Sequence, residues 1–123
     1  MGITLTTAAR DAMCNALVDL VDVGGAGSLE IMTSGDVEVA TLPLSATAFG
    51  ASSTGVATAA AITSDTSATG GTAALHRFMS GGATEIWRGN VLTSGGDLNL
   101  SSLSVGAGDT VSCSAYTVTV PAS

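Results

Sequence analysis

Side chains that could carry acid–base or nucleophilic chemistry are scarce in this 123-residue sequence, which has one histidine, two cysteines and ten carboxylates. A catalytic centre needs a nucleophile or an acid placed against a second titratable group. His76 is the natural general base, and Cys14 is the nucleophile that it could activate. Neither lies in a motif that supports this pairing, and His76 has no second histidine at metal-ligand spacing. We therefore interpret His76 as a packing or surface residue, and we assign no catalytic or metal-binding residue.

The carboxylates are dispersed along the chain. Four of them fall in predicted turns beside Gly, Ser or Thr, namely Asp36, Asp65, Asp97 and Asp109. Aspartate in such positions commonly caps backbone N–H groups, and no Asp-x-Asp-x-Asp loop indicates calcium. Turn capping is therefore the expected role. A structural ion pair of Arg88 with Glu85 or with Asp97 is also possible, and the sequence leaves both partners open.

Glycine-rich loops can cradle phosphate groups, but the stretch Gly24–Gly27 follows a predicted helix instead of preceding one. It also lacks the Gly-Lys-Ser/Thr of a nucleotide-binding loop. The two cysteines, Cys14 and Cys113, have no neighbours at zinc-ligand spacing. We interpret both as small buried thiols, with a disulfide as the alternative. The sequence thus indicates no cofactor, no small-molecule substrate and no enzyme activity.

The composition indicates a surface suited to packing against other protein molecules. Only 11% of residues are charged, against roughly 25% in typical globular domains, and Ser, Thr, Gly and Ala take their place. Such side chains are cheaper to dehydrate than ions when two molecules pack together. The net charge is −7, with three arginines and no lysine. This balance argues against nucleic acid and anionic membranes as partners.

The elements that position these residues begin with a helix over about residues 7–21, capped by Thr6 or Thr7 and stopped by Gly24. It is amphipathic. The polar face carries Asp11, Asn15, Asp19 and Asp22, and the apolar stripe consists of Ala9, Ala12, Met13, Ala16, Leu17 and Leu20. We expect this stripe to pack on the flank of the protein's own sheet. A neighbouring subunit is the alternative destination.

Strand and turn patterns fill the rest of the chain. Predicted strands are Ser28–Met32, Val37–Leu42, Gly55–Thr63, Thr72–Met79, Thr84–Leu92 and Thr110–Val120, the last with a bulge near Ala115. Between the last two lie shorter apolar stretches, Leu98–Leu100 and then Leu103 and Val105. Pro43 should mark an edge position or a strand end. Phe78 and Trp87 should fill the centre of a core made of small residues.

These patterns predict a mainly β fold: an antiparallel β-sandwich, jelly-roll or immunoglobulin-like, of about seven short strands with one N-terminal amphipathic helix. A single domain over residues 1–123 is expected, with the sandwich at about residues 28–120. Met1–Arg10 lacks the features of a secretion signal, so folding in a cytoplasm is expected.

Three segments of the sequence resemble small virion structural proteins of tailed bacteriophages. They are Thr6–Val21, Ala61–Thr66 and Leu98–Pro121. Some proteins of this kind are similar to head decoration, or capsid cement, proteins. The resemblance implies a homotrimer that binds a major capsid protein on the outer head surface and stabilises the capsid lattice. The net charge agrees with this side, because an acidic protein on the inner face would repel packaged DNA.

Two other roles stay open at this point. One is a tail or baseplate component of the virion, and the other is a host-facing adhesin or carbohydrate-binding module. Carbohydrate sites usually use exposed aromatic rings, and the four aromatic residues of this sequence leave few for such a site. The sequence does not assign individual interaction residues.

Overall fold

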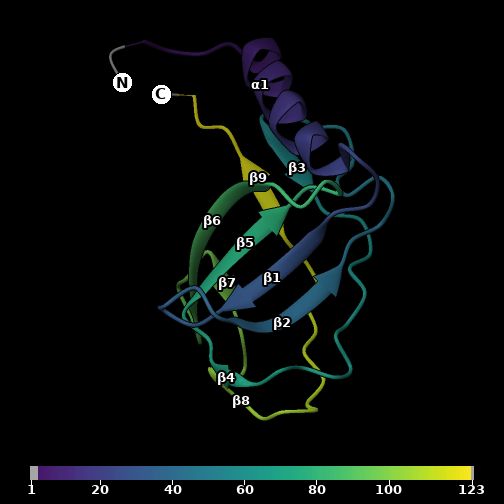
Figure 1. Cartoon of the computed structure of the whole chain (residues 1–123). Coiled ribbons are helices and arrows are strands. Elements are labelled where there is room, and N and C mark those ends of the chain that lie inside the picture. Colours follow the sequence, from purple (N-terminus) through teal and green to yellow (C-terminus); the bar gives the residue numbers. More distant parts are fainter. Residues whose placement is uncertain (1–2, 123) are drawn as a thin grey trace.

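The N-terminal helix and a series of short strands make up the computed structural model, which describes residues 3–122 (Figure 1). Helix α1 spans Thr7–Asp19 and continues into a 3₁₀ turn, η1, at Leu20–Asp22. Thr6 caps the helix, since its Oγ1 accepts a hydrogen bond from Ala9 N at 3.1 Å. The strands are β1 (Ser28–Met32), β2 (Glu38–Pro43), β3 (Val56–Thr58), β4 (Gly71–Thr72), β5 (Leu75–Met79), β6 (Glu85–Leu92), β7 (Leu98–Asn99), β8 (Ser104–Val105) and β9 (Thr117–Thr119).

The main sheet contains five strands in the order β2-β1-β5-β6-β7. Its pairs are antiparallel except for β6–β7, which is parallel. Both predicted hairpins form, β1–β2 and β5–β6. Pro43 ends the edge strand β2, as expected for a residue that cannot donate a backbone hydrogen bond.

Strand register sorts side chains into an inner and an outer face, because successive residues of a strand point to opposite sides. On the inner face, Leu29 pairs with Leu42 on one side and with Phe78 on the other. Phe78 in turn pairs with Trp87. On the outer face, the corresponding row is Thr41, Glu30, Arg77 and Arg88. The sheet therefore has one apolar face and one charged face.

All four aromatic residues meet in one cluster inside the fold. Phe78 stacks on Trp87, with ring centroids 4.6 Å apart, and lies at the same distance from the Tyr116 ring. Phe49 contacts the other three rings at 5.6–6.4 Å. Phe78 and Trp87 thus occupy the centre, as predicted. Phe49 and Tyr116 join them from the opposite layer, and each such pair contributes about 0.5–1.5 kcal/mol beyond simple burial.

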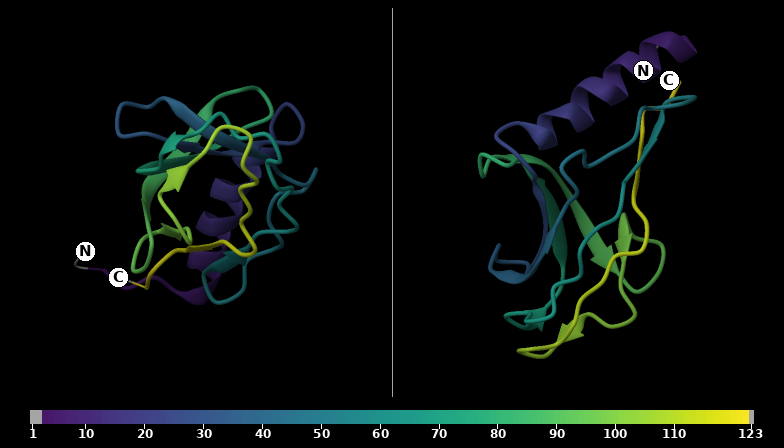
Figure 2. Two further views of the ribbon diagram at one scale, coloured as in Figure 1. Left: turned by 90° about the horizontal axis from the view of Figure 1, so that it is seen from below. Right: turned by 90° about the vertical axis from the view of Figure 1, so that its right-hand side faces the viewer.

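The second layer consists of irregular chain that faces the sheet. Residues 59–68 run beside residues 108–116, joined by backbone hydrogen bonds such as those between Asp65 and Val111 in both directions. Two short antiparallel pairs close the ends of this layer: β3–β9 lies under α1, and β4–β8 lies at the far end (Figure 1). Seen from below, the chain encircles the core (Figure 2).

The predicted class, mainly β with one N-terminal helix, is confirmed, and the facing layers are sandwich-like. Several details differ. The strand predicted over Thr72–Met79 is interrupted, so that Thr72 belongs to β4, which pairs with β8, and only Leu75–Met79 forms β5 in the main sheet. The β6–β7 pair is parallel, the strand predicted over Gly55–Thr63 shortens to β3, and the strand predicted over Thr110–Val120 reduces to β9. Residues 112–116 form no strand, so the expected bulge near Ala115 does not arise. Ser112 and Ser114 are exposed there, so a regular strand in this segment would bury little apolar surface.

Candidate functional site

His76, the only histidine, lies fully buried on strand β5. Its Nδ1 lies 3.0 Å from the carbonyl oxygen of Asn90, and its Nε2 lies 2.8 Å from Tyr116 Oη. A carbonyl oxygen only accepts, so Nδ1 carries the proton and Nε2 accepts the hydrogen bond that Tyr116 donates. Trp87 Nε1 donates to the same Tyr116 oxygen at 3.3 Å. His76 is therefore a packing residue whose two ring nitrogens are both used inside the fold.

The charge state of this group follows from its burial. Burial lowers the pKa of His76 below its usual value and raises the pKa of Tyr116 above its own. Both side chains are thus neutral near pH 7, and the Tyr116 hydroxyl donates its hydrogen bond to a neutral imidazole. Tyr116 was not foreseen as a partner of His76. The only sequence signal is that a tyrosine hydroxyl in a small-residue core needs a polar partner.

The two cysteines have separate surroundings and are not bonded to each other. Cys14 is buried in α1, with Sγ donating to Val118 O at 3.6 Å. Cys113 is half-buried, so the expectation of two buried thiols is wrong for this residue, which lies in the irregular segment before β9. Burial raises the pKa of both thiols. The suggested pair of Cys14 with His76 does not form, because each has other partners.

Three of the four turn aspartates cap backbone N–H groups, as predicted. Asp65 accepts from Thr41 N and Ser67 N, at 2.9 Å each. Asp97 accepts from Asn90 N, and Asp109 accepts from Gly106 N. Asp36 is the exception. It occupies a left-handed backbone conformation, with φ 64°, and its carboxylate pairs with Arg88 on β6.

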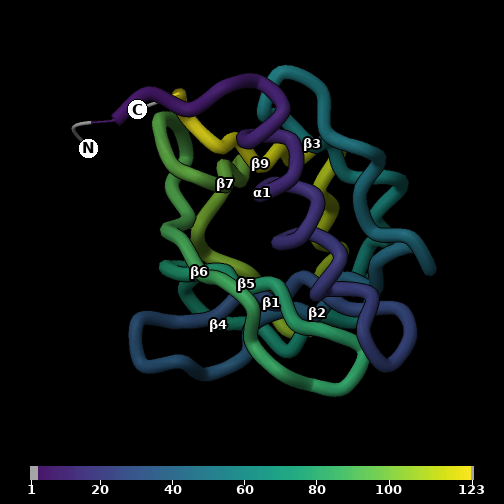
Figure 3. Tube along the Cα trace, turned by 90° about the horizontal axis from the view of Figure 1, so that it is seen from above, coloured from purple at the N-terminus to yellow at the C-terminus, as the bar shows by residue number. Residues whose placement is uncertain are grey.

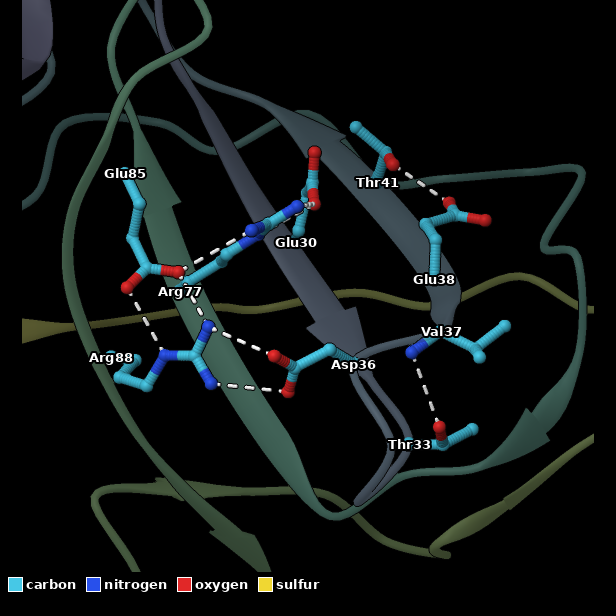
Figure 4. A network of polar contacts seen from close by, with 9 residues as sticks. All are labelled: Glu30, Thr33, Asp36, Val37, Glu38, Thr41, Arg77, Glu85 and Arg88. Carbon is cyan, nitrogen blue, oxygen red and sulfur yellow. Dashed lines mark hydrogen bonds and ion pairs between the residues drawn. The ribbon is translucent and has the colours of Figure 1, made fainter.

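An ion-pair network covers the outer face of the sheet (Figure 4). Arg77 contacts Glu30 at 2.8 Å and Glu85 at 3.3 Å. Arg88 contacts Glu85 at 2.7 Å, which confirms one of its two predicted partners, and Asp36 at 3.1 Å takes the place of the other, Asp97. Hydrogen bonds from Arg88 and Arg77 lower the pKa of the Glu85 carboxyl. Two of the three arginines are thus engaged here.

The third arginine belongs to the inner side of α1, which is unexpectedly polar. Arg10 donates to the carbonyl oxygens of Val120 and Thr54, at 2.9 and 2.7 Å. Asp11 Oδ1 accepts from Gly55 N at 2.8 Å, and Asn15 Oδ1 accepts from Ser52 N at the same distance. These side chains satisfy backbone groups of the loop before β3 and, at Val120 O, of the residue that follows β9. Cys14 and Val18 supply the apolar contacts between them.

The apolar stripe of α1 therefore faces outward, and the expectation that it packs on the protein's own sheet is wrong. Met13 is 50% exposed, Leu20 is 48% exposed, and Val23, one turn further, is 58% exposed. The alanines at positions 12 and 16 are exposed between them. Figures 2 and 3 show α1 at the outer end of the molecule, with its outer side free of other described segments. The backbone N–H groups of Ser52 and Gly55 need acceptors, and the polar face of α1 supplies them. The helix therefore buries its polar face, which periodicity alone does not reveal.

The surface hollows are lined by few titratable side chains. One hollow, of about 490 Å³, lies among the C-terminal loops, and its lining includes Ser101, Ser102, Ser104 and Ser112. Asp109 is its one titratable lining residue, and its carboxylate already holds a backbone turn. A second hollow of about 330 Å³ has Trp87 and Tyr116 in its wall, beside Asp97 and Arg88.

Metal and membrane features were sought across residues 3–122. In that range no three His, Cys, Asp or Glu side chains gather as a metal site would require. No helix among these residues has the length and apolarity needed to cross a membrane. Comparison with family models, with curated proteins and with solved structures finds no match for this chain.

Proposed function

We propose that this chain is a non-enzymatic structural protein of a phage virion, a capsid cement or decoration protein on the outer surface of the head. It assembles with copies of itself, as a homotrimer, and binds a major capsid protein. The observation that carries the proposal is that the arginines and the histidine find their partners within the chain itself. Arg10, Arg77 and Arg88 all bind groups of the same chain, and His76 is buried and neutral.

The carboxylates follow the same rule. Nine of the ten accept hydrogen bonds from the chain itself, and the remaining one, Asp19, is exposed. The charges of the outer sheet face are thus already paired with one another, and much of the remaining surface carries small hydroxyl, methyl and apolar groups. Such a surface loses little hydration energy when it packs against another protein, and repetition on a lattice adds many modest contacts together.

The net charge supports the outer side of the head. Ten acids against three arginines leave −7 per copy, and the arginines are already paired or hydrogen-bonded. Copies on the inner wall would face packaged DNA of the same sign. On the outside, the same charge keeps free copies soluble until they meet the lattice.

The test is the location and copy number of the protein in purified particles. We expect quantitative mass spectrometry to find it in DNA-filled heads at a fixed ratio to the major capsid protein, with many copies per particle. Particles that lack it should release DNA at a lower temperature than complete particles. Absence from heads would overturn the proposal, and a few copies confined to tails would favour a tail or baseplate component instead.

A host-facing adhesin is the second candidate, and the hollow lined by Trp87 and Tyr116 favours it. Aromatic rings beside a carboxylate and a guanidinium are groups that carbohydrate sites use. Trp87 is the only tryptophan, so its fluorescence reports on this hollow directly. Saturable quenching or enhancement by host surface glycans would support the adhesin. An unchanged spectrum over a glycan panel would leave the cement role in place.

A further inference from the structure

The two edges of the main sheet differ in how the chain covers them. At the β2 edge, residues 63–70 run alongside and use its backbone groups, as where Gly70 N donates to Val39 O. At the other edge, β7 pairs only with the last two residues of β6, Val91 and Leu92. The preceding part of β6 therefore has no strand on that side. Natural sheets usually cover or pair such edges.

The hydrogen-bond pattern shows which backbone groups of β6 face this open side. In an antiparallel pair, opposite residues alternate between bonded and non-bonded, and the non-bonded ones turn their N–H and C=O to the other edge. Val91 N donates to Ala74 O, so Arg88, three residues earlier, is of the non-bonded kind. Asn90 is of the same kind, and its N–H binds the Asp97 carboxylate on the open side. The backbone groups of Arg88 therefore point away from β5.

Strand β9 has a free edge of the same kind. Tyr116 and Val120, which flank it, both bond to the chain of β3. Because bonded positions alternate, Thr117 and Thr119 turn their N–H and C=O groups away from β3. Within residues 3–122, the backbone groups of Arg88, Thr117 and Thr119 have no hydrogen-bond partner.

Both free edges line one hollow, the one of about 330 Å³ described above. Residues 87–89 of β6 and residues 116–119 contribute to its wall, and Leu17 of α1 adds an apolar group. Strands β6 and β9 are not neighbours in any sheet. An extended chain presents N–H and C=O groups on both of its sides, so it is the ligand that matches two such edges. Trp87 and Leu17 offer apolar contacts to its side chains.

The charge of the hollow indicates which kind of segment it takes. Asp97 lies in the wall, and no cation pairs with it among residues 3–122. The guanidinium of Arg88 is held by Glu85 and Asp36 on the outer face of the sheet. The chain as a whole carries −7. A segment with a basic side chain is therefore attracted, whereas an acidic one is repelled.

We propose that the hollow between β6 and β9 binds an extended segment of another protein, which adds as a strand along the two free edges and places a lysine or arginine beside Asp97. Because β9 has only three residues, the contact is short and a free peptide binds weakly, with a Kd of about 0.1–1 mM. The site does not depend on a position in a virion. Its failure would leave the cement proposal standing.

A synthetic peptide tests the site on the isolated chain. The probe has about seven residues, Thr and Val in alternation around a central Lys, with blocked ends. NMR titration to about 5 mM should shift the amide signals of Arg88, Thr117 and Thr119 saturably. A probe that is methylated at alternate backbone nitrogens lacks donors and should bind about tenfold more weakly or worse. No shift of these amides, or equal binding of the methylated probe, would overturn the proposal.

A proline at position 119 tests the edge of β9. Thr119→Pro removes the N–H that faces the hollow and no bond to β3, so we expect binding about threefold to tenfold weaker. Thr119→Ala is the matched control, because it loses only an exposed side chain and keeps the N–H. Equal affinity of two folded variants would contradict the proposal. If Thr119→Pro does not fold, the methylated probe decides.

The charge of the probe tests Asp97. Asp97→Asn keeps an acceptor for Asn90 N but loses the charge, so the Lys probe should bind about twofold to fivefold more weakly in low salt. Asp109→Asn, which removes the same charge from a turn elsewhere, should have little effect. Equal losses in the two variants, or tighter binding of a Glu probe, would overturn the basic segment. Shifts of the same amides with protein concentration alone would assign the hollow to a second copy instead.

Discussion

The Nε2 atom of His76 and the Oη atom of Tyr116 lie 2.8 Å apart, although the residues are 40 positions apart in the chain. His76 belongs to the middle strand of the main sheet, and Tyr116 belongs to the irregular segment that crosses the opposite layer. This bond therefore joins a segment with little regular pairing to the middle strand of the main sheet.

Removing the hydroxyl at this point should cost stability. In Tyr116→Phe, His76 Nε2 and Trp87 Nε1 lose their partner, so we expect the free energy of unfolding to fall by about 1–2 kcal/mol. Urea unfolding followed by Trp87 fluorescence measures it. Ser114→Ala, an exposed change in the same segment, should stay within about 0.5 kcal/mol of the parent. If both variants unfold alike, the bond is not what holds the segment.

Stability should fall in mild acid because of His76. Its pKa in the folded protein is lowered below 6.5, so the unfolded chain binds the proton more tightly. The stabilisation is complete above pH 6.5 and is lost as the pH falls toward the lowered value, at up to about 1.4 kcal/mol per pH unit. Glu85, whose pKa is also lowered, adds the same sign only below about pH 4.5. Unfolding free energies measured from pH 7.5 to 5 test this.

A neutral side chain isolates the histidine contribution. His76→Gln should lower stability at pH 7.5 but flatten its dependence on pH between 6.5 and 5, since glutamine does not titrate. An unchanged slope in this variant would assign the acid sensitivity to another group.

The polar side of α1 makes a matched pair of aspartate changes possible. Asp11→Ala leaves the buried Gly55 N–H and the Ser52 hydroxyl without their carboxylate, and we expect a loss of about 1–3 kcal/mol. Asp19→Ala gives the same gain in helix propensity at an exposed site and should have little effect. Thermal unfolding of the two variants side by side gives the comparison. A smaller loss for Asp11 than for Asp19 would contradict the orientation of the helix.

A close contact between two glycine turns predicts a further difference. A methyl group on Gly81 would lie 2.5 Å from the carbonyl oxygen of Gly25, so backbone would have to shift. We expect Gly81→Ala to destabilise the protein by about 1–3 kcal/mol. Gly35→Ala is the control, because its nearest neighbour is Thr33 Oγ1 at 3.9 Å, and it should be neutral or slightly stabilising. Calorimetric melting of both variants decides the point.

Local signals in the sequence predicted the elements well. Thr6 caps the helix, the two hairpins form, and Pro43 closes an edge strand, because caps, turns and alternation depend on neighbouring residues alone. The strand predicted through Cys113 and Tyr116 failed, since its pairing depends on the distant residues 59–65, which offer few large side chains.

The candidate site could be predicted less well. Periodicity identified both faces of α1 but not which one would be buried, because that choice depended on unpaired N–H groups at Ser52 and Gly55, far along the chain. Likewise, nothing near His76 in the sequence indicates Tyr116. Partners chosen by long-range geometry leave no local pattern.

Near the two chain ends, Leu5 N donates to Ala122 O at 2.7 Å, so both ends of the described chain lie together beside α1 (Figure 1). A short peptide linker could therefore join them without disturbing the core. The turn at Thr33–Asp36, exposed at the opposite end of β1, would then be a suitable place for new termini. Such a circular permutant would carry a fused cargo on the side away from the helix and leave the exposed face of α1 free.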